Sequence, residues 1–160
     1  MNRPMKRIAL CLAVLALGLF SLGTAMAFFK PFTLFSATEG VVLLEGRPVE
    51  GVEVQQYYFW HWGDKEATAV THTDANGRYQ FPAITGRSIT ANLLPHEPVI
   101  QQNIRFVHQG KTFKGWGHSK HNYEDLGELG DRPIRLVCDL KDEPGPHPEI
   151  NSYGICTELK

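Results

Sequence analysis

Histidine is the residue type in this 160-residue sequence with the widest chemical reach, and seven histidines are present. His118 and His121 stand three residues apart, a spacing that brings two imidazoles together on one helical turn. His61 and His72 are further candidates from earlier in the chain. Zinc requires three or four converging ligands, whereas the spacing supplies only a pair. Solvated loop histidines are therefore the favoured interpretation, with a metal site as the alternative.

Nucleophilic catalysis would need a serine or cysteine beside a base. The sequence lacks a Gly-x-Ser-x-Gly elbow, a phosphate-binding glycine loop and a His-Glu-x-x-His motif. The serines after residue 27 are few and stand outside such motifs: Ser36, Ser88, Ser119 and Ser152. We therefore predict a protein that is not an enzyme and that uses no cofactor.

The aromatic block Tyr57-Tyr58-Phe59-Trp60-His61-Trp62 is the most unusual feature of the sequence. In a strand its odd-numbered and even-numbered side chains would lie on opposite sides, and only one side has to enter a core. Either the loop over 117–132 or the proline-rich tail covers the other side, or that side binds a partner. Trp116, between two glycines, is a second binding candidate. The predicted partner-binding residues are Tyr58, Trp60, His61, Trp62, Trp116, His118 and His121.

The first 27 residues have the three-part layout of a secretory signal peptide. The start is basic, residues 8–20 form an uncharged apolar run, and Ala25-Met26-Ala27 offers small residues to a signal peptidase. We expect cleavage after Ala27 and an exported, periplasmic product without a stable membrane anchor. An uncleaved anchor is the alternative, because the apolar run extends to Phe29 and is just long enough to span a bilayer.

The mature chain expected from this cleavage, residues 28–160, is mildly acidic, with 13 basic residues against 17 acidic ones. Such a domain lacks the basic surface by which proteins bind nucleic acid or anionic membranes. It retains Cys138 and Cys156, and an oxidising compartment favours a disulfide between them that ties the proline-rich tail to the domain. A buried free Cys138 with an unrelated tail cysteine is the alternative.

Regularly spaced turn residues divide the mature chain into short β-rich segments. This pattern predicts an all-β domain over 28–160, an antiparallel β-sandwich of about seven strands of the immunoglobulin or prealbumin-like kind. Asp74-Ala75-Asn76-Gly77 indicates a tight turn rather than the start of a calcium loop. A long polar loop is expected over 117–132, with a helical turn near 123–126. The predicted strands cover 41–44, 52–59, 67–73, 78–81, 88–94, 99–108, 111–116 and 134–140.

Two motifs support a family assignment. The stretch 40–54, with Gly46-Arg47-Pro48 and Gly51, and the later Thr73-Asp74-Ala75-Asn76-Gly77-Arg78-Tyr79-Gln80-Phe81 resemble the carboxypeptidase regulatory-like domain family. The resemblance covers 40–84 and implies a non-catalytic prealbumin-like or Cna-B-like sandwich, with its core over 38–94 and C-terminal strands and tail over 95–160.

The segments 34–36, 94–100 and 136–140 are similar to those of a group of small exported bacterial proteins that carry this domain. Some small envelope proteins of this type look like immunity proteins, so the resemblance implies a protein partner. The leading hypothesis is a periplasmic immunity protein that binds a toxin and covers its active cleft. A structural envelope module that binds glycan or protein, and a metal-binding periplasmic protein, are the alternatives. The sequence leaves the oligomeric state open.

Overall fold

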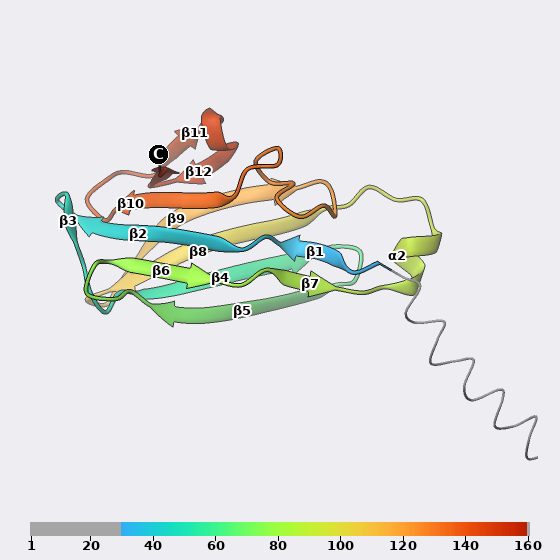
Figure 1. The fold of residues 1–160 in the computed structure, drawn as a ribbon, viewed down its shortest axis with the longest axis horizontal. Helices are drawn as coiled ribbons and strands as arrows, with labels where there is room; N and C mark the ends of the chain where they lie inside the picture. The colour runs from blue at the N-terminus through green and yellow to red at the C-terminus, as the bar shows by residue number, and fades with distance from the viewer. Residues whose placement is uncertain (1–29, 160) are drawn as a thin grey trace, which may run out of the picture.

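The computed structural model describes residues 30–159, which form two layers of β-strands packed face to face (Figure 1). The predicted signal peptide and its cleavage site after Ala27 lie outside these described residues. Between residues 30 and 159, no helix has the length and apolar character needed to cross a bilayer.

One layer is a six-stranded antiparallel sheet with the strand order β11-β12-β9-β8-β4-β5. Its long strands β4, β8 and β9 form the broad centre of the sheet, and short strands from the tail extend one side. The strand bounds are β4 Glu53–Trp60, β5 Lys65–His72, β8 Ile100–His108, β9 Lys111–Lys120, β11 Gly145–His147 and β12 Ser152–Gly154.

The other layer is a five-stranded sheet in which β2 pairs with β3, β6 and β10, and β13 pairs with β10. The two-stranded β1–β7 sheet continues this layer (Figure 1). Pairing of β2 with β10 is parallel, so the sandwich is antiparallel with one exception. The strand bounds are β1 Phe32–Phe35, β2 Thr38–Leu44, β3 Arg47–Pro48, β6 Arg78–Phe81, β7 Ile84–Gly86, β10 Ile134–Asp139 and β13 Cys156–Glu158.

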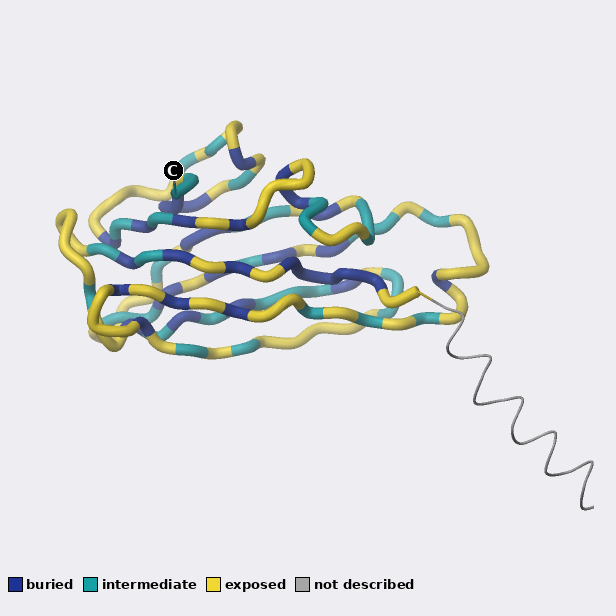
Figure 2. Tube along the Cα trace, viewed as in Figure 1, coloured by how far each residue is buried: buried dark blue, intermediate teal, exposed yellow. Residues whose placement is uncertain are grey.

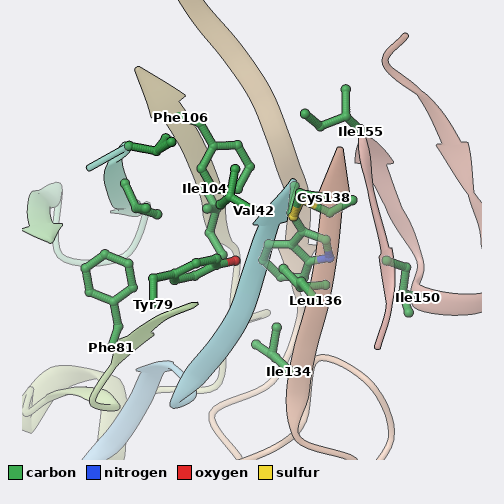
Figure 3. Packing of buried hydrophobic residues seen from close by; sticks show 14 of the residues in the cluster. Val42, Tyr79, Phe81, Ile104, Phe106, Ile134, Leu136, Cys138, Ile150 and Ile155 are labelled. Carbon is green, nitrogen blue, oxygen red and sulfur yellow. A yellow bond between two sulfur atoms is a disulfide. The ribbon is translucent and has the colours of Figure 1, made fainter. Parts of the chain in front are cut away.

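The core lies between the two layers and follows the two-residue period of the strands. Buried and exposed residues alternate along β2, β6 and β10 (Figure 2). Val42 and Leu136 from one layer pack in the same cluster as Ile104 and Phe106 from the other (Figure 3). Full burial of one such side chain stabilises the fold by about 1.5–3 kcal/mol, so this cluster holds the layers together.

The predicted fold class is confirmed: the chain is an all-β sandwich with a long polar loop and a disulfide-tied tail. Both sheets combine strands from 38–94 with strands from 95–160. One predicted strand, 88–94, is wrong, because this segment forms the helix α2, Ile89–Leu93. The hydroxyl of Ser88 accepts a hydrogen bond from the backbone N–H of Ala91 and so caps the helix, which outweighs the strand preference of Ile89 and Thr90.

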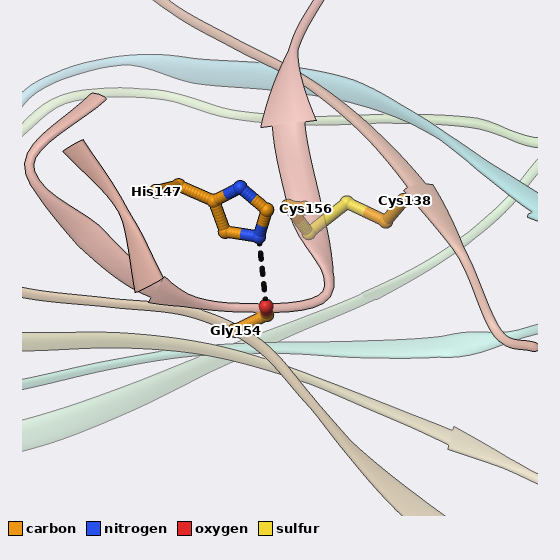
Figure 4. The surroundings of a disulfide bond; sticks show 4 residues. All are labelled: Cys138, His147, Gly154 and Cys156. Atoms are coloured by element: carbon orange, nitrogen blue, oxygen red, sulfur yellow. Dashed lines mark hydrogen bonds between the residues drawn. A yellow bond between two sulfur atoms is a disulfide. The ribbon is translucent and has the colours of Figure 1, made fainter. Parts of the chain in front are cut away.

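The predicted disulfide is also confirmed, since Cys138 of β10 and Cys156 of β13 are bonded and stand opposite each other in the ladder. Nearby, the Nε2–H group of His147 donates to the carbonyl of Gly154 at 3.0 Å, which fixes the tail turn beside the disulfide (Figure 4). Pro146 lies on the edge strand β11, where its missing N–H is tolerated. The polar loop begins after Lys120 rather than at the predicted residue 117, because β9 includes 117–120, and the helical turn expected near 123–126 is absent from the turns that follow.

Candidate binding surface

The sheet containing β4 has one side in the core and one side free of it. Val54, Gln56 and Trp60 of β4 are buried between the layers, so Tyr57 and Phe59 point the opposite way. We call that opposite side of the six-stranded sheet the outer face. The residues of the outer face used below are Gln55, Tyr57, Phe59, Glu66, Thr68, Val70, His72, Gln101, Asn103, Arg105, Lys114, Gly117, Ser119 and Tyr153.

Tyr57 is at the centre of a polar and aromatic group on the outer face. Its hydroxyl donates a 2.5 Å hydrogen bond to the carboxylate of Glu66 on β5. The guanidinium carbon of Arg105 on β8 lies 6.0 Å from the centre of the Tyr57 ring, within range of a cation–π contact. The hydrogen bond to Glu66, aided by the carboxylate charge, raises the pKa of the Tyr57 hydroxyl. Tyr57 therefore offers a neutral ring and a fixed hydroxyl to solvent.

A β-bulge in β9 determines which side chains reach the outer face. Ile104 of β8 pairs with Trp116, and the next residue of β8 pairs with Lys114, so Gly115 is the extra residue. A Cβ atom at Gly115 would lie 2.5 Å from the Phe106 ring and 2.8 Å from the Ile104 carbonyl oxygen. The bulge thus turns Trp116 into the core and leaves Lys114 on the outer face.

A shallow hollow of about 390 Å³ lies on the outer face where β8, β9 and the 151–153 segment meet. The Nζ atom of Lys114 stands 4.5 Å from the centre of the Tyr153 ring, which is 45 % exposed. The lining also includes His118 and residues with amide and hydroxyl side chains, among them Gln101, Asn103 and Ser119. The hollow is therefore polar with one aromatic wall.

Two of the predicted partner-binding residues lie in the core. Trp60 is 1 % exposed and Trp116 is 0 % exposed. Trp60 packs with Phe32, and Trp116 packs with Phe35, both from β1. Neither indole can touch a partner in this fold, so the expectation that these tryptophans are binding anchors is wrong. Because they share their side of the sheet with the Val54 row, they are required to fill the space between the layers.

The polar loop adds to the core on the even-numbered side of the aromatic block, and the odd-numbered side, whose cover the sequence left open, is the outer face. The Trp60 indole N–H donates to the Tyr123 hydroxyl at 3.0 Å, and the Tyr123 ring stacks on Phe32 at 4.0 Å. Trp62 is half-buried and stacks on His96 at 4.0 Å. Of the other block residues predicted to bind, Tyr58 packs against the core, and His61 is exposed with its ring against Phe59.

His118 and His121 have separate hydrogen-bond and ion-pair partners. The Nδ1–H group of His118 donates to the Asn151 carbonyl at 2.8 Å, and burial lowers the pKa of this imidazole. His121 is exposed and its Nδ1 atom lies 3.2 Å from the carboxylate of Glu97. Across residues 30–159, no three histidine, cysteine, aspartate or glutamate side chains converge as a metal site would require.

Sequence reasoning missed the residues that stand out on the outer face. Arg105 and Tyr153 belong to separate strands of unremarkable composition, and only the sheet order brings them beside Tyr57 and Lys114. The register of β4 was a usable signal, because the buried positions Val52 and Val54 already assign the even-numbered residues to the core.

Comparison with known proteins identifies the family of this chain. No curated protein and no solved structure gives a significant match. Residues 38–143 match the model of the family described as domain of unknown function (DUF6795), a range that runs from the first residue of β2 to just beyond β10. Because this match covers more than half of the sequence, the chain belongs to the DUF6795 family.

Proposed function

We propose that this chain is a non-catalytic binding domain that recognises a protein through the outer face. The observation that carries the proposal is that Tyr57, Phe59 and Tyr153 lie on this face, outside the core between the layers. Tyrosine and arginine are among the residues most enriched in binding hot spots, and Arg105 stands over the Tyr57 ring. These groups are held by long paired strands, so little of this surface has to become ordered when a partner binds.

The partner in this proposal is a toxin that acts outside the cytoplasm, and the domain neutralises it by covering its active cleft. The Cys138–Cys156 disulfide supports an oxidising compartment such as the periplasm. Arg105 and Lys114 give the centre of the outer face two cationic groups, which suits a cleft lined with carboxylates. An immunity protein has these properties: export, rigidity and a preformed contact surface.

Kinship with the carboxypeptidase regulatory-like family is part of this proposal, since that family is non-catalytic. The local structure of its motif supports the kinship. Gly77 closes the 74–77 turn with φ +70°, and the Asp74 carboxylate accepts hydrogen bonds from the backbone N–H groups of Asn76 and Arg78. Tyr79 and Phe81 then enter the core, as the motif requires of its two aromatic positions.

The experiment that tests the toxin-inhibitor proposal is a competition assay between cells of one strain. Deleting the gene, with its neighbouring genes intact, should sensitise cells to attack by their parent, and the wild-type gene should restore survival. An Arg105→Glu gene should not restore it, because a partner carboxylate would then face a negative charge. The matched control is Arg135→Glu, which reverses an exposed arginine on the opposite sheet.

Full rescue is expected from the Arg135→Glu control, because its side chain lies away from the outer face. Deletion cells that survive contact with the parent as well as wild-type cells do would show that the toxin-inhibitor proposal is wrong. Equal rescue by the two arginine variants would instead show that the outer face is not the contact surface.

A glycan-binding module is the second candidate, and the hollow beside Tyr153 favours it. Sugars stack on aromatic rings and form hydrogen bonds with amides and hydroxyls such as those of Gln101, Asn103 and Ser119. Lys114 lies over the Tyr153 ring, so it would have to move for a sugar to stack there. Sedimentation with insoluble cell-wall polysaccharide tests this role, since Tyr153→Ala should abolish co-sedimentation if the hollow binds sugar.

A further inference from the structure

Most strands at the margins of the sheets are protected against pairing with another chain. In the part of the chain that the structure describes, β3 has two residues and includes Pro48, β11 includes Pro146, and β6 ends just before Pro82. The margin strands β7 and β13 have three residues each. Short length and proline are the usual means by which proteins prevent edge-to-edge association.

Strand β5 lacks this protection. It has eight residues, Lys65–His72, without glycine or proline, and lies at the outer margin of the six-stranded sheet (Figure 1). Much of this strand is exposed to solvent (Figure 2). Six of its residues are exposed, including Val70 at 54 %. Within residues 30–159 its backbone forms ladder hydrogen bonds with β4 alone. One full side of β5 therefore offers backbone donors and acceptors to another strand.

We propose that β5 pairs antiparallel with β5 of a second copy of this chain, so that two six-stranded sheets join into one across a two-fold axis centred on Ala69. The middle of the strand, Ala67-Thr68-Ala69-Val70, is uncharged and partly β-branched, which suits close pairing. Small alanine side chains at the axis allow the two strands to approach. The contact is self-complementary, as a two-fold interface must be.

Polar complementarity between two copies of β5 favours one register. In the register centred on Ala69, Glu66 of each copy stands opposite His72 of the other, so a carboxylate meets an imidazole twice. Shifting the axis to Val70 sets Glu66 opposite Asp74, which places like charges together. Shifting the axis to Thr68 sets Glu66 opposite Val70, without a polar partner across the interface, and His72 then faces Asp64 of the turn before β5 rather than a residue of the strand. The Ala69 register is thus the complementary one.

Both outer faces lie on the same side of the joined sheet in this arrangement. Glu66, Thr68, Val70 and His72 share their side of β5 with Tyr57, as their pairing with β4 shows. A two-fold axis perpendicular to the sheet preserves that side. A single strand pair is a small interface, so we expect a dissociation constant of roughly micromolar size. Pairing through β5 does not depend on the proposed function, because it uses the backbone edge and the polar side chains of this strand alone.

Cysteine cross-linking tests the register directly. The full chain is purified in a mild detergent with the substitution Cys11→Ser, which removes the native cysteine outside the disulfide, and a short thiol cross-linker is added to the Ala69→Cys and Ala67→Cys variants. The two copies of residue 69 should be adjacent, whereas the two copies of residue 67 should lie about 13 Å apart along the strands, four residues from alignment. We expect a covalent dimer of the Ala69→Cys variant and little of the Ala67→Cys variant. Equal cross-linking of both would overturn the proposed register.

Substitutions that introduce charge test the same contact on side chains that are exposed, so that folding is not at stake. His72→Glu sets two glutamates opposite each other at both ends of the interface and should raise the dimer dissociation constant about tenfold. The double variant Glu66→Lys/His72→Glu places opposite charges at both ends of the interface and should regain most of the affinity. Sedimentation velocity over a concentration series measures both constants, and a double variant as weak as His72→Glu would contradict the pairing.

A wild-type chain that stays monomeric over the whole concentration series, up to about 100-fold above the expected dissociation constant, would overturn the proposal. That result would mean that β5 is free to take a strand from a different protein.

Discussion

Lys120 and Glu128 form an ion pair in the interior of the protein, with 3.1 Å between Nζ and Oε1 and with neither side chain exposed to solvent. Glu128 also accepts hydrogen bonds from the backbone and hydroxyl of Ser36 and from the side chain of Gln102. Lys120 donates a further bond to the carbonyl of Glu124. Buried charges persist in proteins only with compensation of this kind. The pair therefore fixes the polar loop to β9 and to the β1–β2 connection.

Breaking this pair from one side should destabilise the fold strongly. Lys120→Met leaves the Glu128 carboxylate buried without its counter-charge, and we expect the free energy of unfolding to fall by about 3–5 kcal/mol. The double variant Lys120→Met/Glu128→Gln removes both charges and keeps an acceptor for Ser36 and Gln102. Its free energy of unfolding should fall by less than that of Lys120→Met alone. Urea denaturation followed by circular dichroism measures each value.

The exposed pair between Lys141 and Glu45 is the matched control for this prediction. Both of its side chains are mostly in water, so Lys141→Met should change the free energy of unfolding by no more than about 1 kcal/mol. A loss in Lys120→Met no larger than that of Lys141→Met would show that the buried pair contributes little to stability.

The Lys120–Glu128 pair should also make the free energy of unfolding depend on pH in the acid range. Burial by itself would raise the pKa of Glu128, but hydrogen bonds from Ser36 and Gln102 and the charge of Lys120 outweigh burial and lower this pKa. A group whose pKa is lowered in the folded state stabilises the protein fully above its unfolded pKa of about 4.3. That contribution is lost as the pH falls through the folded pKa, because the folded carboxylate must then take up a proton.

The free energy of unfolding should therefore decline as the pH falls below about 5. In the Lys120→Met/Glu128→Gln variant this decline should be shallower, because neither side chain at these positions titrates. Urea midpoints recorded at several pH values down to 3 give the two slopes. Identical slopes for the wild-type chain and the double variant would mean that other carboxylates, such as Asp139, account for acid sensitivity.

The strands of this protein could be located from the sequence because they follow turn residues and a two-residue period. The period of β4 also carried the information that Trp60 is buried, since Val54 and Trp60 are both even-numbered and share one side. The prediction that Trp60 is exposed came instead from its residue type, because tryptophan is frequent at binding hot spots. The two-residue period predicted the burial of Trp60 correctly, since large side chains must fill the space between the two layers.

Other features depend on contacts that a local pattern does not contain. The bulge at Gly115 interrupts the alternation of β9, so Trp116 and Lys120 point to the core side although the strand looks polar. Lys120 and Glu128 lie in a segment whose composition indicates a solvated loop. Their burial results from long-range partners on the β1–β2 connection and β8, which only the folded chain brings near.

Removing the disulfide should reduce stability and leave the outer face intact. Cys138 and Cys156 close a loop over a sequence separation of 18, and such a loop contributes about 3 kcal/mol in the chain-entropy description. The double variant Cys138→Ala/Cys156→Ala should lose about that amount in urea denaturation. Reduction of the wild-type chain should produce a similar loss. Unchanged stability in both experiments would show that the tail is held by its strand pairing alone.

Gly115→Ala should disturb the outer face from within the sheet, because the bulge has no room for a methyl group. The new Cβ atom would meet the Phe106 ring and the Ile104 carbonyl oxygen at 2.5 and 2.8 Å. Overpacking of this kind destabilises a protein by about 1–3 kcal/mol, and it should also shift the fluorescence of the neighbouring Trp116. Gly145→Ala is the control, since a Cβ atom there meets open space. If the two variants unfold at the same urea concentration, the bulge yields without penalty and does not fix the position of Lys114.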